Sequence, residues 1–160
     1  MKSKRNLVVG LLVGAAAVVA LGSVAVAGGH KGKDNDRRAT KITVVERATT
    51  DTAVDNAPAG DSIGDTLAFG NELFDKTNTV KVGTDQGSCV RTVPGVAYEC
   101  SWTNSLKGGQ IVVQGPFLDA GDSVMAITGG TGKYRDVTGT MKLHAIDATS
   151  FQFTFHIHHS

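Results

Sequence analysis

The chain has 160 residues, with 16 Lys and Arg against 15 Asp and Glu, and a formal net charge of +1. This length suits one domain with a single hydrophobic core, because 41% of the residues are hydrophobic. The charge balance argues against a nucleic-acid-binding protein, since there is no excess of basic residues to neutralise phosphates.

The first 27 residues have the pattern of a secretory signal peptide. A basic start is followed by an apolar run over residues 7–21 and by a small-residue cleavage site at residues 25–27. The alternative is a membrane anchor, because residues 7–27 carry no charge and are long enough to cross a bilayer. The Gly and Ala content and the Ala-Val-Ala site favour cleavage.

Cleavage would leave 133 of the 160 residues and remove three basic residues and no acidic ones, giving a net charge of −2. Residues 28–40 are polar, charged and rich in glycine, which predicts a flexible tether. Residues 41–160 then form the folded domain of a secreted, extracellular protein of bacterial type that has no membrane segment after cleavage.

Two cysteines, Cys89 and Cys100, remain in a chain addressed to an oxidising compartment. Their midpoint falls between Pro94 and Gly95, which favour the turn of a hairpin. A symmetric hairpin places the thiols opposite each other, with a Cα separation of about 4.5 or 5.5 Å. This predicts a Cys89–Cys100 disulfide, and the alternative is two buried free thiols.

Short alternating or apolar runs separated by turn residues predict an all-β domain without helices. The predicted strands are residues 41–47, 66–75, 80–93 with an interruption at 85–87, 96–103, 110–117, 123–128, 134–146 and 151–158. Residues 49–64 are expected to form a long loop. Eight such strands indicate a small antiparallel barrel or a sandwich.

The interior of an eight-stranded barrel has room for packed side chains or for one small ligand. The alternation places Leu67, Phe69 and Asn71 on the inner face, with Ile111, Val113 and Phe117 as a facing wall. Asn71 is the informative member of this set, because a buried amide needs partners, and in a lumen these can be water or a ligand oxygen.

The segment VQGPF at residues 113–117 and the segment AITGGTGKYRDVTGTMKLH at residues 126–144 resemble the plant allene oxide cyclases and, more distantly, the dirigent proteins. The resemblance covers roughly residues 63–157. It implies a single eight-stranded, calycin-type antiparallel barrel rather than a sandwich, and it implies a homotrimer, since both families usually form trimers.

The resemblance also implies a set of site residues. The plant cyclases hold an unstable allene oxide in a rigid apolar cavity, with a water held by an asparagine and a carboxylate near the developing cation. Residue by residue, the asparagine falls on Asn71 and the carboxylate on Glu46, while a second water-holding asparagine is replaced here by Ala48. The pocket positions fall on Leu67, Phe69, Cys89, Tyr98 and Phe117.

Each residue also has a structural interpretation. Asn71 can be a satisfied structural amide, Glu46 can be a solvated charge at the rim, and the aromatic residues can be core. The segment GGTGK at residues 129–133 lacks the spacing of a phosphate loop and leads into a strand, so its glycines predict a tight corner. The C-terminal HIHHS has no carboxylate or thiol beside it, which favours a frayed end over a metal site.

We therefore expect a secreted barrel that binds an apolar small molecule and steers its cyclisation or isomerisation, with Asn71 and Glu46 as the reactive groups and Leu67, Phe69, Tyr98, Val113 and Phe117 as the binding wall. No cofactor or metal is expected. The alternatives are a non-catalytic dirigent-like or ligand-binding barrel, and a structural barrel whose lumen is filled by side chains.

Overall fold

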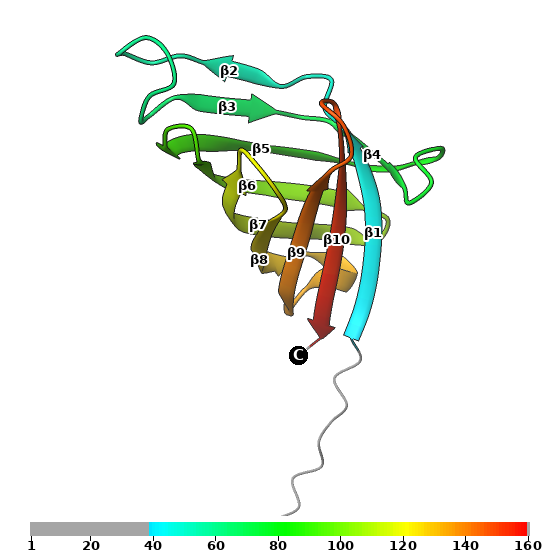
Figure 1. Ribbon diagram of the computed structural model, residues 1–160. Helices are drawn as coiled ribbons and strands as arrows, with labels where there is room; N and C mark the ends of the chain where they lie inside the picture. Colours follow the sequence, from blue (N-terminus) through cyan, green and yellow to red (C-terminus); the bar gives the residue numbers. More distant parts are fainter. Residues whose placement is uncertain (1–38, 160) are drawn as a thin grey trace, which may run out of the picture. The chain divides into compact units, whose positions relative to one another are not determined.

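The computed structural model describes residues 39–159, and these form one antiparallel sheet that closes into a barrel (Figure 1). The elements are β1 (Ala39–Arg47), β2 (Thr52–Val54), β3 (Thr66–Phe69), β4 (Glu72–Asp75), β5 (Lys81–Val93), β6 (Ala97–Leu106), β7 (Gly109–Leu118), β8 (Ser123–Gly130), the 3₁₀ turn η1 (Gly132–Tyr134), β9 (Val137–Ala145) and β10 (Ser150–His159). The predicted signal peptide and nearly all of the predicted tether lie outside the described residues. β1 begins at Ala39, two residues before the predicted domain start.

The barrel has eight strand positions in the order β4-β1-β10-β9-β8-β7-β6-β5, and it closes because β5 pairs with both β6 and β4. β3 and β4 are two halves of one predicted strand, interrupted at Gly70 and Asn71. The predicted all-β, eight-stranded barrel is therefore confirmed. β2, inside the predicted long loop, pairs with β3 along the top edge of the barrel in Figure 1.

The alternation of β10 shows how the sequence forms the barrel wall. Phe153, Phe155 and Ile157 are buried, whereas the intervening residues point outward, as expected for a strand with one buried face. Burying each of these large side chains contributes about 1.5–3 kcal/mol. His158 and His159 remain paired with β9, so the predicted fraying of the C-terminal histidines does not occur up to His159.

The β5–β6 hairpin confirms the predicted disulfide. Its turn contains Gly95, which has a positive φ of 68°. Cys89 and Cys100 are directly opposite in the ladder, with a Cα–Cα distance of 4.0 Å, and their sulfur atoms are bonded. Neither side chain is exposed to solvent, because both lie on the inner face of the barrel.

The predicted interruption at residues 85–87 is wrong, because β5 runs without a break from Lys81 to Val93. The predicted corner at residues 129–133 is present. It is built from the end of β8 and η1, and Gly132 supplies the positive φ of 59°.

Side chains fill one end of the barrel. Ile111, Tyr134, Met141 and Phe155 are almost completely buried there, near the start of β7 and the turn η1. The opposite end, where β1, β7 and β9 finish and β10 begins, has fewer large buried side chains and contains a cavity. The filled end supplies the core, and the open end positions the site.

Residues 39–159 contain neither a membrane-spanning helix nor a cluster of metal ligands. No helix in this range is long and apolar enough to cross a membrane. No group of three or more His, Cys, Asp or Glu side chains in the same range is arranged to hold a metal ion.

Candidate functional site

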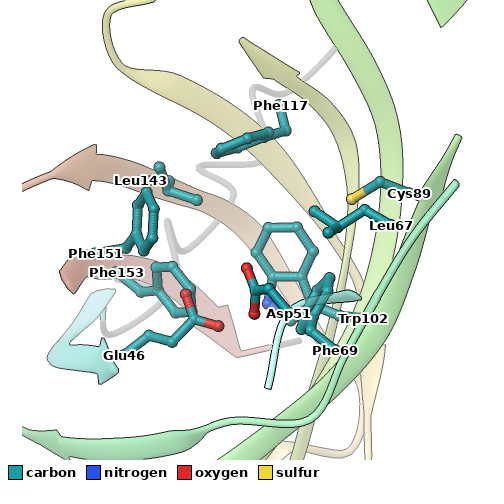
Figure 2. A pocket seen from close by; sticks show the side chains of 10 residues that line it. All are labelled: Glu46, Asp51, Leu67, Phe69, Cys89, Trp102, Phe117, Leu143, Phe151 and Phe153. Carbon is teal, nitrogen blue, oxygen red and sulfur yellow. The ribbon is translucent and has the colours of Figure 1, made fainter. Parts of the chain in front are cut away.

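A cavity of about 150 Å³ occupies the open end of the barrel (Figure 2). Its wall is mostly aromatic and aliphatic, with carboxyl groups on one side. The lining residues are Glu46, Asp51, Leu67, Phe69, Cys89, Trp102, Phe117, Leu143, Phe151 and Phe153. Such a hollow, apolar with few polar groups, is the usual form of a small-molecule site.

The aromatic rings of the wall support one another in edge-on or tilted contacts. The ring centroids of Trp102 lie 5.7 Å from Phe69 and 5.6 Å from Phe153. Phe117 and Phe151 form a second pair, 6.2 Å apart. These separations fall in the favourable range for aromatic pairs, so the rings form a preorganised wall.

The polar side of the cavity is built from Glu46, at the end of β1, and Asp51, in the connection that leads to β2. Asn71 holds both, because its Nδ2 donates to Glu46 Oε1 at 2.9 Å and to Asp51 Oδ1 at 2.7 Å. Glu46 is only 6% exposed. Both carboxyl groups point toward the space between the rings in Figure 2.

Asn71 has no hydrogen-bonding capacity left for a ligand. Its Oδ1 accepts hydrogen bonds from the backbone N–H groups of Thr49 and Thr50 and from Thr50 Oγ1, all at 3.0 Å. Both Nδ2 protons are donated to the carboxyl groups of Glu46 and Asp51, and the side chain is 2% exposed. It is absent from the cavity lining, so its place in the structure is that of a residue that positions Glu46 and Asp51.

A third carboxyl group, Asp85, lies behind Glu46 and is 2% exposed. Its Oδ1 accepts a hydrogen bond from the backbone N–H of Asn71 at 3.1 Å, and the two residues also exchange backbone hydrogen bonds. Its Oδ2 has no hydrogen-bond partner among the described residues. The carboxyl group of Glu46 is its neighbour, and the two groups influence each other's protonation.

The electrostatics follow from burial without a counterion. Desolvation, with the nearby charge of Asp85, raises the pKa of Glu46 to about 9. Desolvation also raises the pKa of Asp85 to about 6. In the described part of the chain, no Lys, Arg or His side chain forms an ion pair with Glu46, Asp51 or Asp85. At neutral pH Glu46 therefore keeps its proton, whereas Asp85 is mostly ionised.

The sequence-predicted residues divide into two groups. Glu46, Leu67, Phe69, Cys89 and Phe117 line the cavity. The other four, namely Asn71, Tyr98, Ile111 and Val113, do not line it. Val113 is buried in the core, and the ring of Tyr98 lies 3.7 Å below the guanidinium carbon of Arg91.

Several cavity-lining residues were not predicted from the sequence, and they differ in how well the sequence could have indicated them. Phe151 and Phe153 have the alternation of an inward face, as does Trp102 beside Cys100, so the strand pattern could have included them. Asp51 gave no local signal, because its place depends on hydrogen bonds to Asn71. Asp85 was not predicted as a site residue, because residues 85–87 have the composition of a turn.

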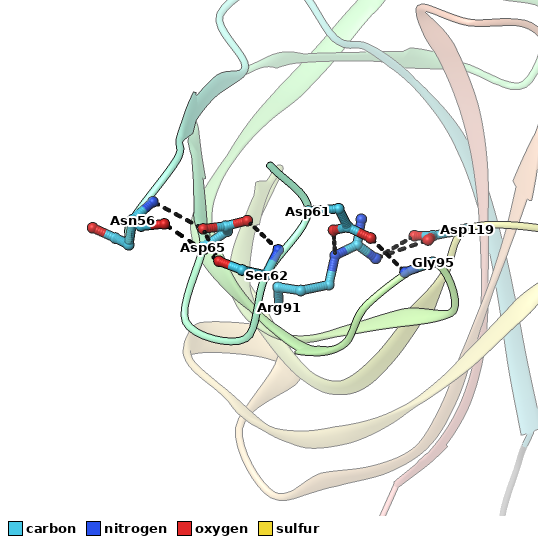
Figure 3. A network of polar contacts seen from close by, with 7 residues as sticks. All are labelled: Asn56, Asp61, Ser62, Asp65, Arg91, Gly95 and Asp119. Atoms are coloured by element: carbon cyan, nitrogen blue, oxygen red, sulfur yellow. Dashed lines mark hydrogen bonds and ion pairs between the residues drawn. The ribbon is translucent and has the colours of Figure 1, made fainter. Parts of the chain in front are cut away.

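A second polar network fastens the loop between β2 and β3 to β5 and to the loop between β7 and β8 (Figure 3). Arg91 Nη1 donates to both carboxylate oxygens of Asp119, at 2.7 and 2.8 Å, and Arg91 Nε lies 2.6 Å from Asp61 Oδ1. Asp61 also accepts the backbone N–H of Gly95 at 2.5 Å. Asp65 closes the loop by accepting the backbone N–H groups of Asn56 and Ser62. Arg91 and Asp61 together thus join the loop between β2 and β3, the turn between β5 and β6, and the loop between β7 and β8.

Comparison with known proteins agrees with this architecture. The sequence profile of the allene oxide cyclase family matches residues 33–159. A pyocyanin demethylase has a similar structure, with a TM-score of 0.67 and 23% identity over 74% of this chain and 99% of that one. So does the pterocarpan synthase dirigent protein PsPTS1, with a TM-score of 0.63 and 18% identity over 76% and 96% of the two chains.

The exo-specific intermolecular Diels-Alderase AbnU is a third similar structure, with a TM-score of 0.61. It is 16% identical over 76% of this chain and 98% of that one. At these identities the three likenesses show a shared fold, and the chemistry of this cavity has to be argued from its own residues.

Proposed function

Because this chain belongs to the allene oxide cyclase family, we propose that it binds an apolar small molecule in the cavity and steers its cyclisation or isomerisation. The observation that carries the proposal is the pairing of a rigid aromatic wall with the buried carboxyl group of Glu46 on one side of the same hollow. Family membership and structural likeness to a Diels-Alderase and a dirigent protein support it.

The proposed mechanism is mainly conformational. The ring contacts of Trp102 with Phe69 and Phe153 keep the wall in one shape, and a flexible substrate folded against it is held with its reacting atoms close together. Asp51 stabilises positive charge that develops during ring closure, and Glu46 adds to this when it gives up its proton, because the water-poor cavity weakens charges less than bulk water does. Asn71 fixes both carboxyl groups beforehand, so they need no reorganisation.

Retention of a compound tests the binding step. The full chain is incubated with a mixed pool of apolar metabolites, repurified and analysed by native mass spectrometry. Leu67→Trp places a large side chain in the cavity wall, and Val124→Trp is the matched control on an exposed outer position. We expect compounds retained by the wild type and Val124→Trp and lost from Leu67→Trp. Retention of no compound by the wild type would remove the proposal.

The handedness of the product tests the steering step. A retained achiral polyene, or a racemic epoxide, that cyclises spontaneously in water gives both mirror-image products in equal amounts, whereas a chiral wall favours one. We expect an excess of one enantiomer with the wild type and less with Phe117→Ala, because the Phe117–Phe151 contact forms part of the wall. A racemic product with the wild type would contradict steering.

A second candidate is a non-catalytic barrel that binds or guides a ligand. It is favoured by the chemistry of the lining, since Cys89 is held in a disulfide and only carboxyl groups remain as acid or base groups in the wall. This second function would be identified by a compound that the protein retains, whose reaction proceeds no faster than in water but yields a single enantiomer. Export from the cell and homotrimer formation remain predictions of the sequence.

A further inference from the structure

We propose that the protein binds an extended acidic peptide segment of a partner protein along the free edge of β1. This inference goes beyond the proposed function, because the site shares no residue with the lining of the cavity. Three features of the described residues carry it: a stretch of β1 that has a strand neighbour on one side only, an apolar floor beside that stretch, and three lysines without ion pairs.

The first half of β1 is an open edge. β1 pairs with β10 along its whole length, Ala39–Arg47, but it pairs with β4 only from Val44 onward. Figure 1 shows β1 continuing beyond β4. In an antiparallel sheet, alternate residues turn their backbone N–H and C=O groups to opposite sides. Alternate residues within 39–43 therefore turn these groups away from β10, where no strand of residues 39–159 pairs with them. A further strand can pair there.

A groove lies beside this edge, in the place that β4 would occupy if it continued. β4 ends at Asp75, and the chain leaves in the loop of residues 76–80 before β5 begins at Lys81. The groove has a volume of about 470 Å³. We call it the lysine groove, and its lining residues are Ile42, Thr43, Val44, Asp75, Lys76, Val82, Leu106, Lys107, Lys133 and Tyr134.

The floor of the lysine groove is apolar. Ile42 and Leu106 pack against the hydrophobic core, and Tyr134 belongs to that core. In a strand paired with β1, successive side chains point to opposite faces, so every second side chain would rest on this floor. The floor therefore favours apolar residues at alternate positions of the bound segment.

Three lysines surround this floor. Lys76, Lys107 and Lys133 come from three different connections, and none of them forms an ion pair within residues 39–159. The backbone N–H of Lys133 donates to the carbonyl oxygen of Gly108 at 2.9 Å, which keeps Lys133 beside the β6–β7 turn that carries Lys107. The lysines favour acidic residues at the outward positions of the segment.

The acidic residue of the lining is already engaged by its own loop. Asp75 accepts hydrogen bonds from the backbone N–H groups of Thr79 and Val80 and from Thr77 Oγ1, at 2.9, 3.2 and 2.7 Å. The hydrogen bond from Thr79, with those from Thr77 and Val80, lowers the pKa of Asp75 to about 2. The lining thus carries three positive charges and one negative charge at neutral pH, so an acidic partner is attracted.

An extended peptide is the occupant that uses all three features. A lipid surface or a small anion would contact the lysines, but it would leave the backbone edge unpaired. The segment that precedes β1 has the wrong charge, because residues 28–38 contain four Lys and Arg against two Asp. Lysines beside an edge also discourage pairing with most other strands, which makes the edge selective for an acidic one.

Three peptides of equal length test the charge. The acidic probe is acetyl-Glu-Val-Glu-Val-Glu-Val-Glu-amide, and the two others carry Gln or Lys in place of every Glu. Binding to the full chain at about pH 7 is measured by isothermal titration calorimetry. We expect the acidic probe to bind at least about tenfold more tightly than the Gln probe, with the Lys probe weakest. Added salt should weaken the acidic probe and leave the Gln probe unchanged.

Methylation of the probe tests the backbone pairing. The N–H groups of the Val residues and those of the Glu residues point to opposite edges of an extended peptide. We therefore compare the acidic probe methylated at every Val nitrogen with the one methylated at every Glu nitrogen, and we expect exactly one of them to lose binding. Hydrogen exchange followed by NMR should show alternate fast and slow amides within residues 39–43, and the acidic probe should slow the fast ones.

Variants place the probe in the lysine groove. Lys107→Gln and Lys133→Gln should each weaken the acidic probe by about threefold or more, and Lys142→Gln on β9 is the control for the loss of an exposed lysine charge. Val82→Trp should obstruct the groove, and Val124→Trp is the matched control. Both valines are exposed, so either variant is expected to fold.

A preference for the acidic probe that one methylation pattern removes supports the inference. Equal binding of the acidic and Gln probes, no binding of the acidic probe, or an equal effect of the two methylation patterns overturns it. Slow exchange of every amide within residues 39–43 in the free chain also overturns it, because the edge would already be occupied. Preference for phosphatidylglycerol over phosphatidylcholine vesicles that Lys107→Gln reduces, without binding of the acidic probe, would assign the lysines to a membrane instead. Each of these results leaves the function proposed for the cavity standing.

Discussion

Phe69 and Trp102 meet edge to face across Gly87, with their ring centroids 5.7 Å apart. Gly87 lies directly opposite both residues in the sheet, between β3 and β6. A Cβ atom at this position would overlap the Cβ of Trp102. The absence of a side chain at Gly87 is therefore what allows the aromatic wall of the cavity to close.

Gly87→Ala should separate these rings and destabilise the barrel. We expect a loss of about 1–3 kcal/mol in the free energy of unfolding, because the added methyl group has to displace backbone atoms and the Cβ of Trp102. Urea titration followed by Trp102 fluorescence measures it. Gly129→Ala is the control, since a Cβ atom there meets no atom within 4 Å. Equal stability of the two variants would show that the wall does not need this glycine.

Asn71→Leu should release the loop that carries Asp51. The substitution keeps the volume but leaves the N–H groups of Thr49 and Thr50 without their acceptor, and it removes the donor to Glu46. We expect at least about 2 kcal/mol of destabilisation. Hydrogen exchange should accelerate selectively at Thr49 and Thr50, with the amides of β8 and β9 as internal controls. Unchanged protection of Thr49 and Thr50 would contradict the positioning role of Asn71.

The stability of the protein should fall as the pH rises from about 5 to 9, because folding raises the pKa of Glu46 from 4.5 to about 9. In this interval the folded protein retains a proton that the unfolded chain has released, so each increase in pH favours unfolding. Asp85, with its pKa raised to about 6, adds the same sign in the lower part of the interval. Urea titrations at a series of pH values should show a total decrease of at least about 2 kcal/mol.

Glu46→Gln isolates the cause of this pH dependence. The variant should flatten the upper part of the profile, whereas Glu99→Gln, an exposed change on β6, should leave it intact. The aspartates with a lowered pKa, including Asp65 and Asp75, act with the opposite sign and below about pH 4, outside this interval. A wild-type stability that rises between pH 5 and 9 would show that Glu46 ionises freely in the folded protein.

Arg91→Lys should loosen the rim while preserving the charge. Lysine cannot contact both oxygens of Asp119 together with Asp61, nor stack a flat group on Tyr98. We expect a loss of about 1–3 kcal/mol and faster proteolytic cleavage within residues 55–65. Arg135→Lys is the matched control, because its side chain is 79% exposed. Identical cleavage rates for the two variants would mean that Arg91 does not hold this loop.

The fold could be predicted from the sequence because its signals are local. Alternation within β1, β6, β7 and β10 and turn residues between them specify the strands, and the position of Pro94 and Gly95 specifies the register that joins Cys89 to Cys100. The predicted interruption at residues 85–87 was wrong because Asp and Gly are common in turns. Here Asp85 is buried beside Glu46, and Gly87 makes room for Trp102, so the local rules fail at the site itself.

The site was only partly predictable because its geometry is not local. The alternation of side chains along each strand correctly placed Leu67, Phe69 and Phe117 inside the barrel. It could not show that Val113, which also points inward, lies in the filled end and not in the cavity wall. That distinction depends on how far each strand is shifted along its neighbour when the barrel closes. Asp51 depends on an amide 20 residues away in the chain.

The aromatic side chains of the cavity come from strands of the barrel. Asp51 instead belongs to the short connection between β1 and β2, which is not part of any strand of the closed barrel. A library of variants randomised at the side chains of that connection alone would vary the polarity of the cavity. The barrel strands would be unchanged, so the barrel would still unfold cooperatively. The polarity of the cavity is therefore open to redesign by exchange of a few connector residues.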